Sequence, residues 1–223
     1  MLAPAPVQIP IGEQTVSGDL TISEDASALV IFAHGSGSSR LSPRNRFVAR
    51  ALEQRGLATL LIDLLTPRED TLDERSGELR FDIALLAKRL VTIIDWVRLR
   101  RETARLAIGL FGASTGAGAA LIAASERPDH VGAVVSRGGR PDLAGGALRH
   151  VTVPTLLIVG SLDETVIAMN RTAMNQMRAK VELEIVPGAT HLFEEPGALQ
   201  QIAALAGQWF AAHLRPGAAG PGP

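Results

Sequence analysis

The stretch that decides the fold is Leu106–Gly116, with the sequence LAIGLFGASTG. Its first half is an apolar run of the length of a buried strand. Its second half, Gly112–Gly116, is a G-x-S-x-G pentapeptide that leads into an alanine-rich helical segment, Gly118–Ala124. Such a sharp strand-to-helix turn forces Ser114 towards positive φ and exposes its hydroxyl beside a helix N-terminus, which favours developing negative charge. An ordinary helix start with an N-cap serine is the alternative interpretation of the stretch.

Short runs rich in Val, Ile and Leu alternate with longer amphipathic stretches on both sides of this turn. The expected strands are Leu29–Ala33, Ala58–Asp63, Leu106–Phe111, Val131–Ser136, Thr155–Gly160 and Glu182–Val186, after a hairpin of Val7–Ile11 and Thr15–Ile22. The expected helices are Arg44–Arg55, Phe81–Arg100, Ser114–Glu126, Thr165–Lys180 and Pro196–His213. This alternation predicts an α/β fold with a mostly parallel central sheet and helices on both faces. We expect the chain to form a single domain, residues 1–215, followed by a disordered C-terminal tail over residues 216–223.

The composition excludes several classes of function. The sequence contains no cysteine and no tyrosine, which excludes a thiol nucleophile and the phenol-dependent short-chain dehydrogenases. Its two lysines, Lys88 and Lys180, do not lie in a phosphate-binding P-loop. The 22 basic and 23 acidic residues leave a formal charge of −1, so we expect no binding to nucleic acid or to membranes. Because Met1–Pro10 does not resemble a signal peptide, we expect a cytoplasmic protein.

A serine nucleophile needs a histidine to take its proton and a carboxylate to hold that histidine in the right tautomer. Of the five histidines, His191 lies in the loop between the last expected strand and the last helix, from which it can reach the centre of the sheet. Asp163 follows the strand before it, while Asp142 is a second possible acid position. The structural alternative for Asp163 is a helix N-cap. Ser114, Asp163 and His191 would form a catalytic triad in that chain order.

Five segments of the chain carry a family resemblance. They are His34–Arg40 (HGSGSSR), Gly112–Gly116 (GASTG), Ser136–Asp142 (SRGGRPD), Gly160–Asp163 (GSLD) and Gly188–Pro196 (GATHLFEEP). With them the chain resembles α/β-hydrolases of the dienelactone hydrolase-like family, from the hairpin to His213. It is most similar to hydrolases fused or adjacent to phosphoribosyltransferase domains, although these 223 residues hold no such domain. Dienelactone hydrolases proper have a cysteine where this chain has Ser114, so dienelactone specificity does not follow.

An acyl-transfer reaction also requires two hydrogen-bond donors directed at the oxyanion. One is the amide that follows the nucleophile, here that of Thr115. The family pattern places the other at the residue after His-Gly, which is Ser36, while His34 itself is expected to bond loop backbone. The segment Thr66–Arg80 has 15 residues with eight charges and no clear strand or buried-helix pattern, so we expect no large cap domain and an open, shallow site.

Arginines cluster near the expected site. Arg137 and Arg40 could each hold a substrate carboxylate with two parallel hydrogen bonds. The alternative is that these arginines cap strand ends, pair with protein carboxylates or face water.

Together these features predict a serine carboxylesterase that cleaves small or medium acyl esters through an acyl-enzyme intermediate, without a metal or an organic cofactor. Lactone, thioester or amide hydrolysis on the same triad remains open, as does a non-catalytic relative that binds a ligand in the same cleft. We expect a small-molecule ester as partner and either a monomer or a homodimer.

Overall fold

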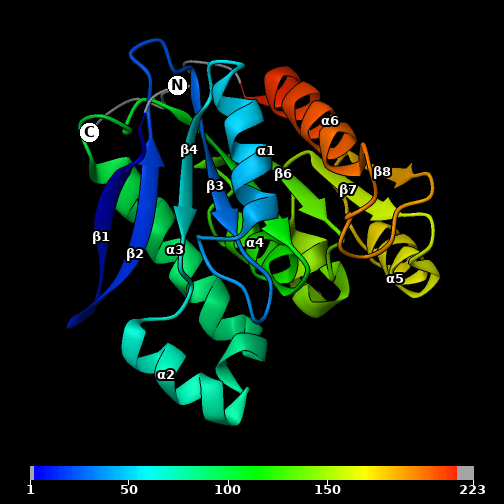
Figure 1. Cartoon of the computed structure of the whole chain (residues 1–223), viewed down its shortest axis with the longest axis horizontal. Coiled ribbons are helices and arrows are strands. Elements are labelled where there is room, and N and C mark those ends of the chain that lie inside the picture. The colour runs from blue at the N-terminus through cyan, green and yellow to red at the C-terminus, as the bar shows by residue number, and fades with distance from the viewer. Residues whose placement is uncertain (1–2, 215–223) are drawn as a thin grey trace.

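Eight strands form one sheet in the computed structural model, which describes residues 3–214 (Figure 1). They are β1 (Ala5–Ile11), β2 (Gln14–Thr21), β3 (Ala28–Ala33), β4 (Ala58–Ile62), β5 (Ala107–Ala113), β6 (Val131–Arg137), β7 (Thr155–Gly160) and β8 (Val181–Val186). The sheet order is β1-β2-β4-β3-β5-β6-β7-β8; β1 and β2 run antiparallel to their neighbours and the remaining pairs are parallel. The predicted α/β fold is confirmed, while the predicted tail, residues 216–223, lies outside the described residues.

Helices cover both faces of this sheet. On one face lie α1 (Pro43–Glu53) and α6 (Ala198–His213); on the other lie α3 (Ile83–Leu99), α4 (Thr115–Glu126) and α5 (Glu164–Met174) (Figure 1). Strand β3 explains why both faces need cover, because all six of its residues are buried. Ile31 packs in the apolar core under α3 and α4, and Phe32 packs in the core under α1 and α6. A strand that is apolar on both sides is stable only between two helical layers.

The segment Thr66–Arg80 forms no large cap domain, as predicted, but it is helical: it contains α2 (Pro67–Ser76) and a short 3-10 turn, η1 (Leu79–Phe81). Thr66 and Glu69 form a capping box at the start of α2. The buried Asp73 accepts the N–H groups of Leu79 and Arg80 and pairs with the Arg80 guanidinium at 2.5 Å. Hydrogen bonds to one buried carboxylate therefore help to hold this segment, in which no apolar residue of α2 is buried.

The largest difference in an element boundary concerns α5. Helix α5 ends at Met174 rather than at Lys180, because the chain tightens there into turns in which Gln176 and Met177 donate to residues three positions back. A 3-10 segment, η2 (Pro141–His150), connects β6 to β7. Within residues 3–214, no helix has both the length and the apolar character needed to cross a bilayer.

Candidate active site

Ser114 occupies a strained turn between β5 and α4. Its backbone has φ 49° and ψ −121°, a region that L-residues rarely adopt, and its side chain does not cap α4. A Cβ added to Gly112 would lie 2.4 Å from Ala117 Cα, and one added to Gly116 would lie 2.5 Å from the Ala33 carbonyl oxygen. The two glycines are therefore required for the turn. The geometry is that of a nucleophile elbow and not of an ordinary N-cap serine.

His191 is hydrogen-bonded to Asp163. Its Nδ1 lies 2.6 Å from Asp163 Oδ2, and since a carboxylate only accepts, Nδ1–H is the donor and Nε2 is left to accept a proton. Asp163 follows β7 and makes no side-chain cap to α5. The other possible acid, Asp142, instead receives the Arg140 guanidinium at 2.7 and 2.8 Å. Of the two candidate carboxylates, the structure brings Asp163 to the histidine.

Ser114 and His191 face the same cavity, which has a volume of about 250 Å³. The residues that line it are Gly35, Ser36, Ser38, Ser42, Arg44, Asn45, Ala113, Ser114, Arg137, His191 and Leu192. Within the described part of the chain, no hydrogen bond joins Ser114 to His191. In ligand-free enzymes, the contact between a nucleophile and its base is often long and shortens when substrate binds. Among the described residues, the cavity therefore contains a serine, a histidine whose Nε2 has no hydrogen-bond partner, and a buried cation.

The loop after β3 lies against the elbow. A Cβ on Gly35 would come within 2.9 Å of Ser114 Cβ, so the backbone of this loop approaches the serine closely. The Ser36 amide donates to the Thr115 hydroxyl oxygen at 2.9 Å. This amide was predicted to donate to a substrate oxyanion. In the structure its N–H already donates to a side chain of the protein.

His34 fixes the shape of the same loop. Its Nδ1 lies 2.9 Å from the Gly35 carbonyl oxygen, and its Nε2 accepts the N–H of Leu64 at 3.1 Å. Nδ1–H is therefore the donor, and the ring is neutral. Burial lowers the pKa of His34, which keeps it neutral. This is the structural role expected from the sequence.

Arg137, the last residue of β6, is buried in the wall of the cavity and is only 7% exposed. It donates to Asn45 Oδ1 at 3.1 Å, and its guanidinium carbon lies 6.0 Å from the centre of the Phe193 ring. In the described residues it forms no ion pair with a carboxylate; burial and the nearby charge of Arg44 lower its pKa to about 10. Arg44 itself pairs with Glu194 at 3.1 Å. Arg137 is thus a charged group without an anionic partner beside Ser114.

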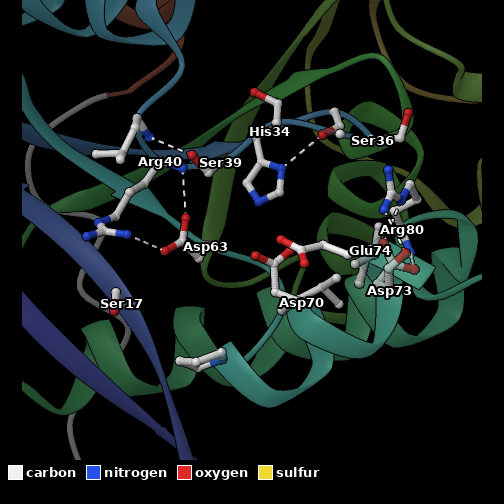
Figure 2. Close-up of a pocket in the computed structure, with 17 residues that line it drawn as sticks. Ser17, His34, Ser36, Ser39, Arg40, Asp63, Asp70, Asp73, Glu74 and Arg80 are labelled. Atoms are coloured by element: carbon white, nitrogen blue, oxygen red, sulfur yellow. Dashed lines mark hydrogen bonds and ion pairs between the residues drawn. The ribbon is translucent and has the colours of Figure 1, made fainter. Parts of the chain in front are cut away.

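Arg40, the other predicted substrate-binding arginine, lies elsewhere. It pairs with Asp63 at 2.5 Å and with Asp19 at 3.5 Å, and it lines a second cavity of about 550 Å³ (Figure 2). That cavity separates the loop after β3 from helix α2, and Figure 2 shows Asp70 and Glu74 of α2 pointing into it. Because two carboxylates already neutralise Arg40, the prediction that it binds substrate gains no support from its position.

The loop that carries His191 is fastened on both sides of the histidine. Glu195 accepts the amide of Thr190 at 3.1 Å and its hydroxyl at 2.6 Å; the hydroxyl contact lowers the pKa of Glu195. Phe193 is fully buried and has φ 55°. The sequence analysis did not predict a role at the site for Asn45 or Phe193, nor the contact between Thr190 and Glu195. The contact of Asn45 with Arg137 spans 92 residues and leaves no local pattern.

Comparisons with known proteins agree with this fold. The model of the dienelactone hydrolase family matches residues 21–212. The crystal structure of a dienelactone hydrolase from Anabaena variabilis ATCC 29413 is 57% identical, covers 96% of this chain and 100% of that one, and superposes with a TM-score of 0.93. Est1E from Butyrivibrio proteoclasticus, solved with ferulic acid, shares the fold at 15% identity, with coverage of 93% and 98% and a TM-score of 0.78.

A curated relative from Mycobacterium tuberculosis (strain ATCC 25618 / H37Rv) carries a phosphoribosyl transferase name. It is 54% identical over 217 residues, which make up 97% of this chain and 47% of that protein. The chain therefore spans about half the length of the curated relative it matches. With the family model matched from β2 to α6 and the elbow in place, the chain belongs to the dienelactone hydrolase family of α/β-hydrolases.

Proposed function

We propose that this hydrolase is a serine carboxylesterase with Ser114 as nucleophile, His191 as general base and Asp163 as the acid that orients it. The observation that carries the proposal is the 2.6 Å contact between His191 Nδ1 and Asp163. His191 lines the same cavity as the strained Ser114. A histidine held by a carboxylate through Nδ1 presents Nε2 to the nucleophile, which is the arrangement that activates serine.

In the proposed reaction, Ser114 Oγ attacks the ester carbonyl while His191 Nε2 takes the hydroxyl proton. The carbonyl oxygen becomes an oxyanion near the N-terminus of α4, where the Thr115 N–H is directed. His191 then gives its proton to the departing alcohol, and Asp163 stabilises the imidazolium until that transfer is complete. Water, activated by the same histidine, releases the acid from Ser114. No step calls for a metal or an organic cofactor.

We propose that the acyl group is small or medium in size and bears a carboxylate that meets Arg137. Support comes from the burial of Arg137 and from its single protein acceptor among the described residues, Asn45 Oδ1. A buried cation is normally paired, so a substrate anion in the cavity of about 250 Å³ would complete the site. Lactones and thioesters of similar shape would suit the same cavity.

A fluorophosphonate probe tests the proposal without knowledge of the natural substrate. We expect the native protein to be labelled covalently and Ser114→Ala to remain unlabelled while folded. Absence of labelling in a folded native protein would instead favour a non-catalytic, ligand-binding relative. Chromogenic esters of increasing acyl length, assayed beside a lactone and a thioester, would then define the bond and chain length that the enzyme prefers.

A further inference from the structure

The Thr115 hydroxyl stands between the elbow and the loop after β3. Thr115 directly follows Ser114 as the first residue of α4, and it is 5% exposed. Its oxygen accepts the Ser36 amide at 2.9 Å across 79 residues of sequence. That oxygen therefore occupies the position in front of the Ser36 N–H that a substrate oxyanion would need to fill.

The Thr115 hydroxyl can still donate one hydrogen bond. A threonine hydroxyl has one hydrogen to donate and two lone pairs to accept with. One lone pair is used by the Ser36 N–H, and in the described part of the chain no acceptor takes the hydroxyl hydrogen. Donors buried this deeply usually have a partner, so the missing acceptor indicates that a ligand supplies it. The Thr115 main-chain N–H also has no partner within its helix, because it lies in the first turn.

From this geometry we infer that the Thr115 hydroxyl, and not the Ser36 amide, is the second donor to the oxyanion. The inference rests on the proposed serine-esterase function. As the bond from Ser114 Oγ to the carbonyl carbon forms, the carbonyl π electrons move onto oxygen, which then accepts both the N–H and the O–H of Thr115. The Ser36 amide acts behind the hydroxyl and polarises it, since hydrogen bonds in a chain strengthen one another.

A rival arrangement makes the opposite prediction. If the hydroxyl only fills the gap in front of Ser36 and swings away when substrate binds, removing it would free the Ser36 N–H. Catalysis would then be unchanged or faster. The two arrangements can be separated with Thr115→Val, which keeps the branched shape but has no hydroxyl, and Thr115→Ser, which keeps the hydroxyl.

The experiment measures the second-order rate of labelling by a fluorophosphonate, whose phosphoryl oxygen enters the oxyanion hole, together with kcat and KM for 4-nitrophenyl acetate. We expect Thr115→Val to lower the labelling rate and kcat by about 10²–10³-fold, the cost typical of one lost oxyanion donor, with KM nearly unchanged. Thr115→Ser should stay within about tenfold of the native rate. Circular dichroism and the unfolding midpoint would verify that both variants fold.

Labelling of Thr115→Val at the native rate or faster would overturn the inference while leaving the serine nucleophile intact. An unlabelled native protein would overturn the proposed function and this inference with it. If Thr115→Val does not fold, Thr115→Ala offers the same comparison with Thr115→Ser and the same two outcomes.

Discussion

Arg137 at the end of β6 and Asn45 in α1 are joined by a hydrogen bond of 3.1 Å inside the cavity that holds Ser114. Both side chains are buried, with exposed fractions of 7% and 2%. A neutral amide satisfies one N–H of a guanidinium that has five. Arg137 lines this cavity, where we propose that its charge meets a substrate carboxylate.

Replacing Arg137 with methionine should discriminate between charged and neutral acyl groups. For the 4-nitrophenyl monoester of succinate, we expect KM to rise by about 10–100-fold, because one charged hydrogen bond is lost. For the 4-nitrophenyl ester of butyrate, KM should change little. Arg40→Met is the matched control and should leave both esters unaffected, since Arg40 already pairs with Asp63 and Asp19. Equal losses on both esters would point to a packing role for Arg137 instead.

Asp163→Asn should impair the histidine without unfolding the site. An amide in place of the carboxylate can stabilise the wrong tautomer of His191 and cannot stabilise the imidazolium, so kcat should fall by about 10³–10⁴-fold. Steady-state hydrolysis of 4-nitrophenyl acetate is the measurement. Asp142→Asn is the control, since that carboxylate binds Arg140, and its kcat should remain near the native value. A comparable loss in both variants would contradict the assignment of Asp163.

Gly116→Ala should destabilise the protein and damage the elbow together. The new Cβ would lie 2.5 Å from the carbonyl oxygens of Ala33 and His34, and backbone atoms cannot move aside as a flexible side chain can. We expect the free energy of unfolding in urea to fall by about 1–3 kcal/mol, with a loss of fluorophosphonate labelling. Gly146→Ala, where a Cβ would meet no atom within 4 Å, should be close to neutral in both measurements.

His34 should make stability fall on mild acidification. Burial lowers its pKa in the folded state, whereas the unfolded chain has the ordinary value of 6.5. Below that pH the unfolded state binds a proton that the folded state does not, so the contribution of His34 is complete above pH 6.5 and is lost as the pH falls further. The slope from this residue should reach at most about 1.4 kcal/mol per pH unit.

Urea unfolding of the native protein and of His34→Gln between pH 7.5 and 5 would give the slope of the free energy of unfolding against pH for each protein. The difference between these two slopes measures the contribution of His34. Identical slopes would show that His34 does not contribute.

The strand, turn and helix around Ser114 could be predicted because their signals are local. The apolar run, the two glycines and the alanine-rich segment are adjacent in sequence, and the predicted strand Leu106–Phe111 overlaps β5, Ala107–Ala113. Helix α2 was missed because only Asp73 is buried among its ten residues. Its signals were the capping pair Thr66 and Glu69 and a left-handed Gly77, which a search for apolar periodicity does not detect.

The details of the cavity could not be predicted for a different reason. Ser36 meets Thr115 across 79 residues, and Arg137 meets Asn45 across 92. Each pair depends on how β3, α1, β5 and β6 are arranged in three dimensions, and no spacing along the chain encodes it. The sequence could narrow the arginines to a few candidates, but only their partners in the fold distinguish Arg137 from Arg40.

The cavity is assembled from residues that follow several different strands of the sheet. Ser114 follows β5 near the centre of the sheet, Asp163 follows β7, and His191 follows β8 at the edge. Helix α6, the last described element, packs against α1 from the beginning of the fold. During synthesis the serine is made before its histidine, and the three side chains can meet only when β5, β7 and β8 have all joined the sheet. Covalent labelling of Ser114 would then report a complete sheet and not early collapse.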